Sequence, residues 1–161
     1  MEINELLLLL TILFSGLMAG LFYAWSISVT PGLARINSRS FLLAFQSMNR
    51  AILNPVFFIP FMGTALLLPL LSYLRFGNSK LQFWLILSAT AVYLLGIMGI
   101  TIGGNVPLNN QLEELKVDSM PEEEMQSFRA NFEGRWNTLN WIRTFASALT
   151  LILLSLALYY S

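Results

Sequence analysis

The side chains best suited to chemistry lie between positions 129 and 147, where the sequence changes from polar to apolar. At about 100° per residue, a helix places within about 60° of Asn140 the side chains of Arg129, Glu133, Trp136, Asn137, Arg143, Thr144 and Ser147. An arginine that stays ionised in an apolar pocket suits a carboxylate, phenolate or enolate. Asparagine donates and accepts hydrogen bonds, and tryptophan provides a flat apolar wall. This stripe predicts a site at which Arg143, Asn140 and Glu133 act on a ligand.

Polar residues elsewhere are expected to join the same pocket. Asn105 and Asn109 flank Pro107 at the end of an apolar segment, where backbone groups lack partners, so they either cap a helix or line the pocket. Arg50 and Asn54 lie on the polar side of an amphipathic segment, where they face either the pocket or a wet interface. The predicted pocket residues are Trp136, Asn137, Thr144, Asn105, Asn109, Arg50 and Asn54.

The stripe also has structural interpretations. Arg143 could bind helix carbonyls or lipid phosphate, and Trp136 and Trp141 could belong to the aromatic belt at the membrane surface. We favour a ligand-facing position for Arg143 and the belt for Trp141, and leave both alternatives open for Trp136. Arg135 falls on the opposite side of the helix and is expected to reach outward to headgroups or solvent.

Four apolar segments must position these residues. The chain has 161 residues, of which 56% are hydrophobic and 11% charged, whereas soluble domains average about 25% charged. Segments long enough to cross a bilayer, which takes about 20 apolar residues, occur at about 6–29, 55–74, 81–104 and 138–160. Pro31 and Gly32 are expected to end the first. The sequence predicts an all-α, four-helix transmembrane bundle, a multi-pass integral membrane protein with one domain over residues 1–161.

Two polar segments connect these spans. A helix capped by Asn37 or Ser38 is expected to be amphipathic and to bend before the second span. As one straight helix, residues 38–74 would extend about 55 Å, well beyond the ~30 Å hydrocarbon core. Residues 108–132 are expected to form a polar, partly helical loop between the third and fourth spans.

Composition excludes several classes of site. The chain contains no cysteine, which rules out disulfides, thiol catalysis and thiolate metal sites. It contains no histidine, the commonest metal ligand and the usual general base near neutral pH. The net charge is zero, so nothing indicates nucleic-acid binding. We therefore expect no metal and no cofactor.

Basic residues predict the orientation of the bundle. Seven lysines and arginines follow the first and third spans, whereas only Arg75 and Lys80 follow the second. By the positive-inside rule, the first and third loops are expected in the cytoplasm and both chain ends outside.

Glycines predict close helix packing. Gly16 and Gly20 form a small-xxx-small pair, and Gly96, Gly99 and Gly103 lie along the third span. Either set could also serve as an oligomer interface.

Two motifs carry a family resemblance. The sequence Gly-Asn-x-Pro-Leu-Asn-x-x-Leu occupies 104–112, and Arg-Trp-Asn-x-x-Asn-x-x-Arg-Thr occupies 135–144. Together with four spans, these motifs resemble the anthrone oxygenase-like integral membrane family, also catalogued as a domain of unknown function. The resemblance covers essentially the whole chain. It implies a cofactor-independent oxidation of anthrones to anthraquinones, with matching positions at Asn105, Asn109, Trp136, Asn137, Asn140 and Arg143.

The resemblance makes an oxygenase one hypothesis for this chain, acting on a lipophilic phenolic or anthrone-like compound. Arg143 and the asparagines would hold the enolate oxygen, Trp136 would stack on the rings, and Glu133 is the nearest candidate base. The alternative is a non-catalytic membrane protein that binds lipid or quinone, or an accessory subunit of a membrane complex. A small transporter is less favoured, because no internal repeat is visible. The expected partners are membrane lipid and a lipophilic aromatic small molecule.

Overall fold

The computed structural model describes residues 3–77 and 80–160 of the chain, and every regular element within these ranges is a helix. The elements η1, η2 and η3 are π-helical, and η4 is a 3-10 turn. In chain order the elements are α1 (Ile3–Ala24), η1 (Trp25–Val29), α2 (Thr30–Leu33), α3 (Ser38–Ile52), α4 (Pro55–Arg75), α5 (Lys80–Tyr93), η2 (Leu94–Gly99), η3 (Thr101–Asn105), α6 (Val106–Glu113), η4 (Val117–Ser119) and α7 (Glu122–Tyr159).

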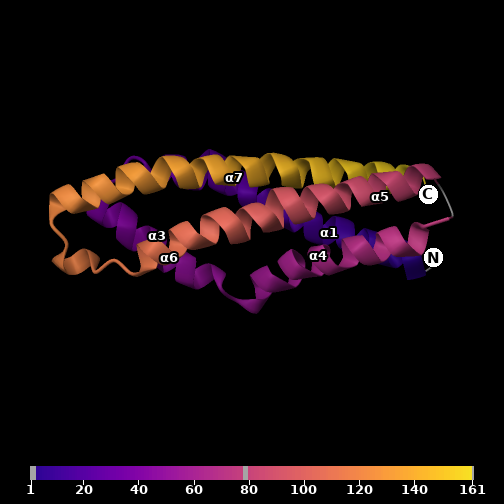
Figure 1. The fold of residues 1–161 in the computed structure, drawn as a ribbon, viewed down its shortest axis with the longest axis horizontal. Coiled ribbons are helices and arrows are strands. Elements are labelled where there is room, and N and C mark those ends of the chain that lie inside the picture. Colours follow the sequence, from indigo (N-terminus) through magenta and orange to yellow (C-terminus); the bar gives the residue numbers. More distant parts are fainter. Residues whose placement is uncertain (1–2, 78–79, 161) are drawn as a thin grey trace.

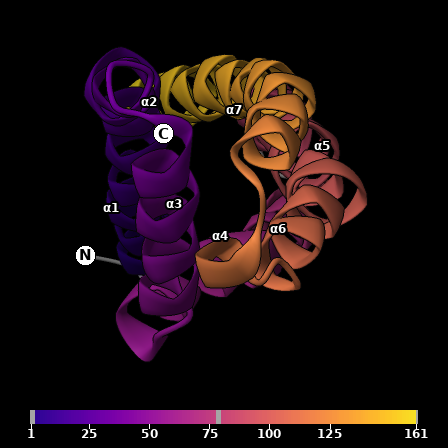
Figure 2. The same ribbon diagram turned by 90° about the vertical axis from the view of Figure 1, so that its left-hand side faces the viewer.

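Four continuous helical stretches are long and apolar enough to cross a membrane: Ile3–Leu33, Pro55–Arg75, Lys80–Glu113 and Glu122–Tyr159. They run side by side, and the described ends of the chain lie at the same end of the bundle as the end of α4 and the start of α5 (Figure 1). Viewed end-on, the four stretches stand around a common axis (Figure 2). The predicted all-α, four-helix transmembrane bundle is confirmed, and the chain is a multi-pass membrane protein.

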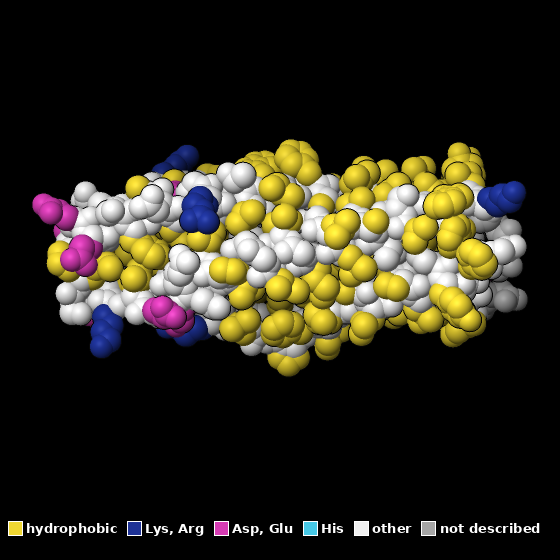
Figure 3. Space-filling model, in the orientation of Figure 1, with side chains coloured by type: hydrophobic (Ala, Val, Ile, Leu, Met, Phe, Trp, Pro, Cys, Tyr) yellow, Lys and Arg dark blue, Asp and Glu magenta, His cyan; other side chains and the backbone are white. Residues whose placement is uncertain are grey.

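Helix length divides the bundle into a membrane part and a head. The 38 residues of α7 extend about 57 Å, whereas the hydrocarbon core measures about 30 Å. Hydrophobic side chains cover most of the bundle, while the acidic side chains on the visible face gather at the end that carries α3 and α6 (Figure 3). We call this end the head. It holds the first and third loops together, and the side of the membrane on which it lies stays a prediction.

The two predicted connecting segments are present. The amphipathic helix is α3, whose cap is Asn37, which accepts the Ser40 backbone N–H at 2.8 Å. The chain then bends, and Asn54 caps α4 by accepting the Phe57 N–H at 3.1 Å. The polar loop before α7 consists of α6, η4 and the turns around them. The predicted bend before the second span is therefore confirmed.

Two of the π-helical segments end just before a proline. The segment η1 ends two residues before Pro31, and η3 ends two residues before Pro107. Proline lacks an N–H, and its ring clashes with the carbonyl four residues back, so the wider turn of a π-helix accommodates it. The first helix consequently continues through Pro31 to Leu33, which corrects the expectation that Pro31 and Gly32 end it.

Two hydrophobic clusters meet at the boundary between head and membrane. The membrane cluster includes Leu68, Ile86, Tyr93, Ile97 and Leu154, and the head cluster includes Phe41, Phe45, Leu112, Phe132 and Trp136. Gly96 lets α7 approach closely, because a Cβ at Gly96 would lie 2.8 Å from Ala146 Cβ. Gly20, by contrast, faces open space, and its use in an oligomer stays a prediction.

Candidate functional site

A cavity of about 310 Å³ lies at this boundary, within the usual range for small-molecule sites. Its walls come from η1, α3, α4, η2, η3, α6 and α7, together with the end of α1. Most of its lining is apolar or aromatic. Its polar lining residues are Asn49, Thr101, Asn105, Asn109, Asn140 and Arg143. The cavity thus combines apolar walls with a small set of converging polar groups.

Arg143 provides the only charged side chain among the described residues of this lining. It is 7% exposed, and its Nη2 donates to Asn140 Oδ1 at 2.8 Å. A longer contact of 3.4 Å joins Nη1 to Thr101 Oγ1. The guanidinium lies 4.6 Å from the ring centre of Phe22 and 5.4 Å from that of Trp136. It is therefore held between two aromatic rings and neutral hydrogen-bond acceptors.

This environment leaves the positive charge of Arg143 uncompensated. None of the described lining residues is Asp or Glu, and Nε is buried without a hydrogen-bond partner in that part of the chain. Removing an ion from water costs several kcal/mol unless a counter-charge and hydrogen bonds compensate it. Cation–π contacts of about 0.5–2 kcal/mol cover only part of that cost. An anionic oxygen in the cavity would supply the missing partner.

Asn140 is held so that its carbonyl oxygen faces Arg143. Its Nδ2 donates to Ser26 Oγ at 2.8 Å and to the Phe22 carbonyl at 3.2 Å, which fixes the amide orientation. Thr144 Oγ1 lies 2.9 Å from the same Ser26 hydroxyl. Thr144 is buried but is not among the cavity-lining residues. It therefore contacts Ser26, the partner of Asn140, rather than the cavity.

The head side of the cavity carries further unpaired polar groups. Asn105 is 1% exposed, and neither its Nδ2 nor its Oδ1 has a partner among the described residues. Nδ2 of Asn49 is likewise buried and unpaired there. Asn109 instead accepts the Trp136 indole N–H at 2.8 Å. Buried polar groups normally have partners, so these amides of Asn105 and Asn49 have hydrogen-bonding capacity that the described residues do not use.

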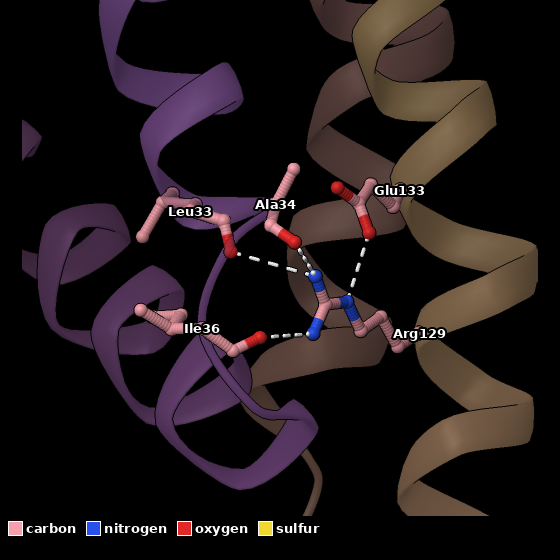
Figure 4. Close-up of polar contacts among 5 residues, drawn as sticks. All are labelled: Leu33, Ala34, Ile36, Arg129 and Glu133. Carbon is pink, nitrogen blue, oxygen red and sulfur yellow. Dashed lines mark hydrogen bonds and ion pairs between the residues drawn. The ribbon is translucent and has the colours of Figure 1, made fainter.

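Glu133 lies outside this arrangement. Arg129 Nε donates to Glu133 Oε2 at 2.8 Å, and its Nη atoms donate to the carbonyls of Leu33, Ala34 and Ile36 at 3.4, 3.0 and 2.6 Å (Figure 4). These carbonyls belong to the end of α2 and the turn after it. Glu133 therefore orients an arginine that joins the first helix to α7, and it is not among the residues lining the cavity.

Four predicted pocket residues also lie outside the cavity lining: Thr144, described above, and Arg50, Asn54 and Asn137. Arg50 is 61% exposed and pairs with Glu113 on the surface of the head. Asn54 caps α4, as described above, and donates to the Ala51 carbonyl at 2.7 Å. Asn137 is half-buried outside the cavity lining. Of the predicted residues, the structure brings Arg143, Asn140, Trp136, Asn105 and Asn109 together around the cavity.

Several wall residues were not predicted. Phe22 and Trp25 come from the first helix, and Thr101 comes from η3. The 3.6-residue period does not continue through the π-helical segment η2 that precedes Thr101. Phe22 and Trp25 reach the cavity through packing between helices, which no pattern within the first helix predicts. Asn49 comes from α3, where it shares the polar side of the helix with Arg50. Within residues 3–77 and 80–160, no cluster of three or more His, Cys, Asp or Glu could hold a metal ion.

Comparison with known proteins places the chain in a family. Neither the curated proteins nor the solved structures gave a significant match. The family model described as anthrone oxygenase matches residues 41–153, a region that runs from α3 into α7 and includes most of the cavity wall. Because this match covers most of the chain, the protein belongs to the anthrone oxygenase family.

Proposed function

We propose that this membrane protein is an oxygenase that needs no metal or organic cofactor and acts on a flat, lipophilic phenolic compound of the anthrone type. The observation that carries the proposal is the uncompensated charge of Arg143 on the wall of an apolar cavity. Membership of the anthrone oxygenase family supports the choice of substrate class.

The reaction requires an oxyanion partner of this kind. An anthrone is weakly acidic at the carbon opposite its carbonyl, and loss of that proton gives an aromatic enolate. The enolate carbon transfers electrons to O₂ and forms a C–O bond, giving a hydroperoxide once protonated. Cleavage of the O–O bond, with loss of the second hydrogen from the same carbon, releases water and leaves a carbonyl. Overall, anthrone and O₂ give anthraquinone and water.

The cavity residues take distinct roles in this proposal. Arg143 and Asn140 form the oxyanion site: Asn140 holds the guanidinium by its Nη2, and the guanidinium, whose charge has no counter-ion in the described lining, binds the enolate oxygen. Trp136 and Phe22 bound the space on either side of the charge and supply apolar walls for the rings. Asn105 binds a polar ring substituent. Since Glu133 is engaged by Arg129, we assign the departing proton to a water molecule inside the cavity.

Oxygen uptake by the reconstituted protein tests the proposal. Anthrone should be consumed with one equivalent of O₂ and without added cofactor, faster than it autoxidises in empty membranes. Loss of one oxyanion donor typically costs about 10²–10³-fold in rate, so Arg143→Met should lose most of the acceleration. Arg135→Met, which removes an exposed arginine of the same helix, is the matched control. Binding of the aromatic compound without O₂ uptake would favour a non-catalytic binding protein instead.

A further inference from the structure

A groove on the outer surface adjoins the cavity. It runs between α1 and the first half of α4, and its lining is almost entirely apolar: Phe14, Leu53, Asn54, Pro55, Phe58, Ile59, Met62 and Gly63. Leu53, Phe58 and Met62 also line the cavity. The same side chains therefore face the cavity on one side and the groove on the other.

The wall shared by the groove and the cavity is a single layer of side chains. Phe58 and Met62 are each 41% exposed, so no second layer of the described protein covers them. Methionine is unbranched and flexible, and it adapts readily to irregular spaces. Pro60, between them, donates no backbone hydrogen bond, which loosens the first turns of α4. Rotation of these two side chains would join the groove to the cavity.

The groove ends at a close helix contact. A Cβ added at Gly63 would lie 2.8 Å from Phe14 Cε2, so the Phe14 ring of α1 lies directly against α4 there. Gly63 is eight residues after Pro55, the start of α4, or about 12 Å along the helix. The groove thus opens toward lipid in the part of the span nearest the head.

Aromatic rings pack closely where the cavity meets η1, α3 and α7. The rings of Trp25, Phe45 and Trp136 form a three-membered cluster, with centroids 4.9 Å apart for Phe45 and Trp136 and 5.1 Å apart for the two tryptophans. The indole N–H of Trp136 is additionally bonded to Asn109. Such paired rings pack favourably in tilted and edge-to-face geometries. Entry between η1, α3 and α7 would have to disrupt this cluster.

We propose that the ligand enters the cavity sideways from the lipid bilayer, through a gate formed by Phe58 and Met62. The inference rests on the proposed function in one respect, namely that the cavity binds a flat lipophilic aromatic compound. Such a compound concentrates in the hydrocarbon phase, where the groove opens. Its uncharged form crosses the apolar gate and meets Arg143 only inside.

The absence of native cysteine makes the gate directly testable. Met62→Cys is modified with N-cyclohexylmaleimide in nanodiscs, and Leu66→Cys, 69% exposed on the same helix and outside the groove, is the matched control. Binding of alizarin, a dihydroxyanthraquinone, is followed by quenching of Trp25 and Trp136 after Trp84→Phe and Trp141→Phe remove the other tryptophans. Quenching that persists in Arg143→Met is subtracted as non-specific.

Labelling at Met62 should slow both association and dissociation of alizarin by on the order of tenfold, because a gate hinders entry and exit alike. Labelling at Leu66 should change neither rate. Unchanged rates after labelling at Met62, equal slowing at both positions, or no Arg143-dependent binding at all would overturn the lateral entrance. If gating holds but anthrone consumes no O₂, the oxygenase proposal fails and the entrance stands.

Discussion

Replacement of Arg143 by methionine separates a ligand-binding arginine from a structural one. Methionine keeps a long, flexible and apolar side chain at this buried position, so packing against Phe22 and Trp136 is largely retained. The substitution removes the charge, the bond to Asn140 and the contact with Thr101. We expect the free protein to keep its thermal stability while losing affinity for an oxyanion.

The magnitudes follow from the contacts of Arg143. A hydrogen bond to a charged group contributes about 1.5–3 kcal/mol, and the cation–π contacts contribute about 0.5–2 kcal/mol. The desolvation penalty that disappears with the charge is several kcal/mol, so the gains and losses nearly cancel. For a ligand oxyanion, the lost charge-assisted bond of about 1.5–3 kcal/mol corresponds to about 10- to 150-fold weaker binding.

Two assays on the same sample distinguish a ligand-binding role of Arg143 from a structural one. Thermal melting in mild detergent reports stability, and titration with alizarin reports binding. A change of 1 kcal/mol shifts the melting temperature of a protein this size by about 2–4 °C, so we expect a shift of at most a few degrees. A structural arginine with a buried partner would cost about 3–5 kcal/mol when removed. A fall in melting temperature of about 10 °C or more, with alizarin affinity unchanged, would refute the reasoning.

Three further substitutions test the supporting structure. Arg129→Ala should lower the melting temperature clearly, because it removes the hydrogen bonds to three carbonyls at and just after the end of the first helix. Arg129→Lys should recover only part of the lost stability, since lysine lacks the planar fork of arginine. The exposed Arg135→Ala should have little effect on the melting temperature. Gly96→Ala should destabilise the folded protein by about 1–3 kcal/mol, because the added methyl group overpacks against Ala146. Gly20→Ala should not, because open space surrounds Gly20. Chemical denaturation in detergent measures the stability of both variants. Trp136→Phe keeps a ring but loses the bond to Asn109, so alizarin titration should show binding weakened by about 1 kcal/mol, or roughly fivefold.

The sequence predicts helices more reliably than it predicts partners. Apolar length predicts the four spans, because a bilayer of fixed thickness requires it. Angular spacing about Asn140 separates Arg143 from Arg135, since both lie within one regular helix, and the structure places Arg143 on the cavity wall and Arg135 at the surface. The direction in which a side chain points from one regular helix can therefore be predicted from the sequence.

Contacts between elements could not be predicted in the same way. The pairing of Arg129 with Glu133 follows helical spacing, but the carbonyls at the end of α2 and in the turn after it, which accept from Arg129, come from nearly 100 positions earlier in the chain. Likewise, the π-helical segment η2 shifts the rotation of the residues after it, so no regular wheel places Thr101 on the cavity wall. These features depend on tertiary packing rather than on local pattern.

In the proposed mechanism, the cavity stabilises an aromatic oxyanion beside Arg143. Alizarin reports this directly, because its visible absorption changes when its phenol ionises. With the dye bound in nanodiscs, a pH titration compares the natural protein with Arg143→Met. Since a nearby positive charge favours the anion, the colour change should occur at lower pH in the natural protein than in the variant. The same midpoint in both proteins, or a higher one in the natural protein, would contradict the account.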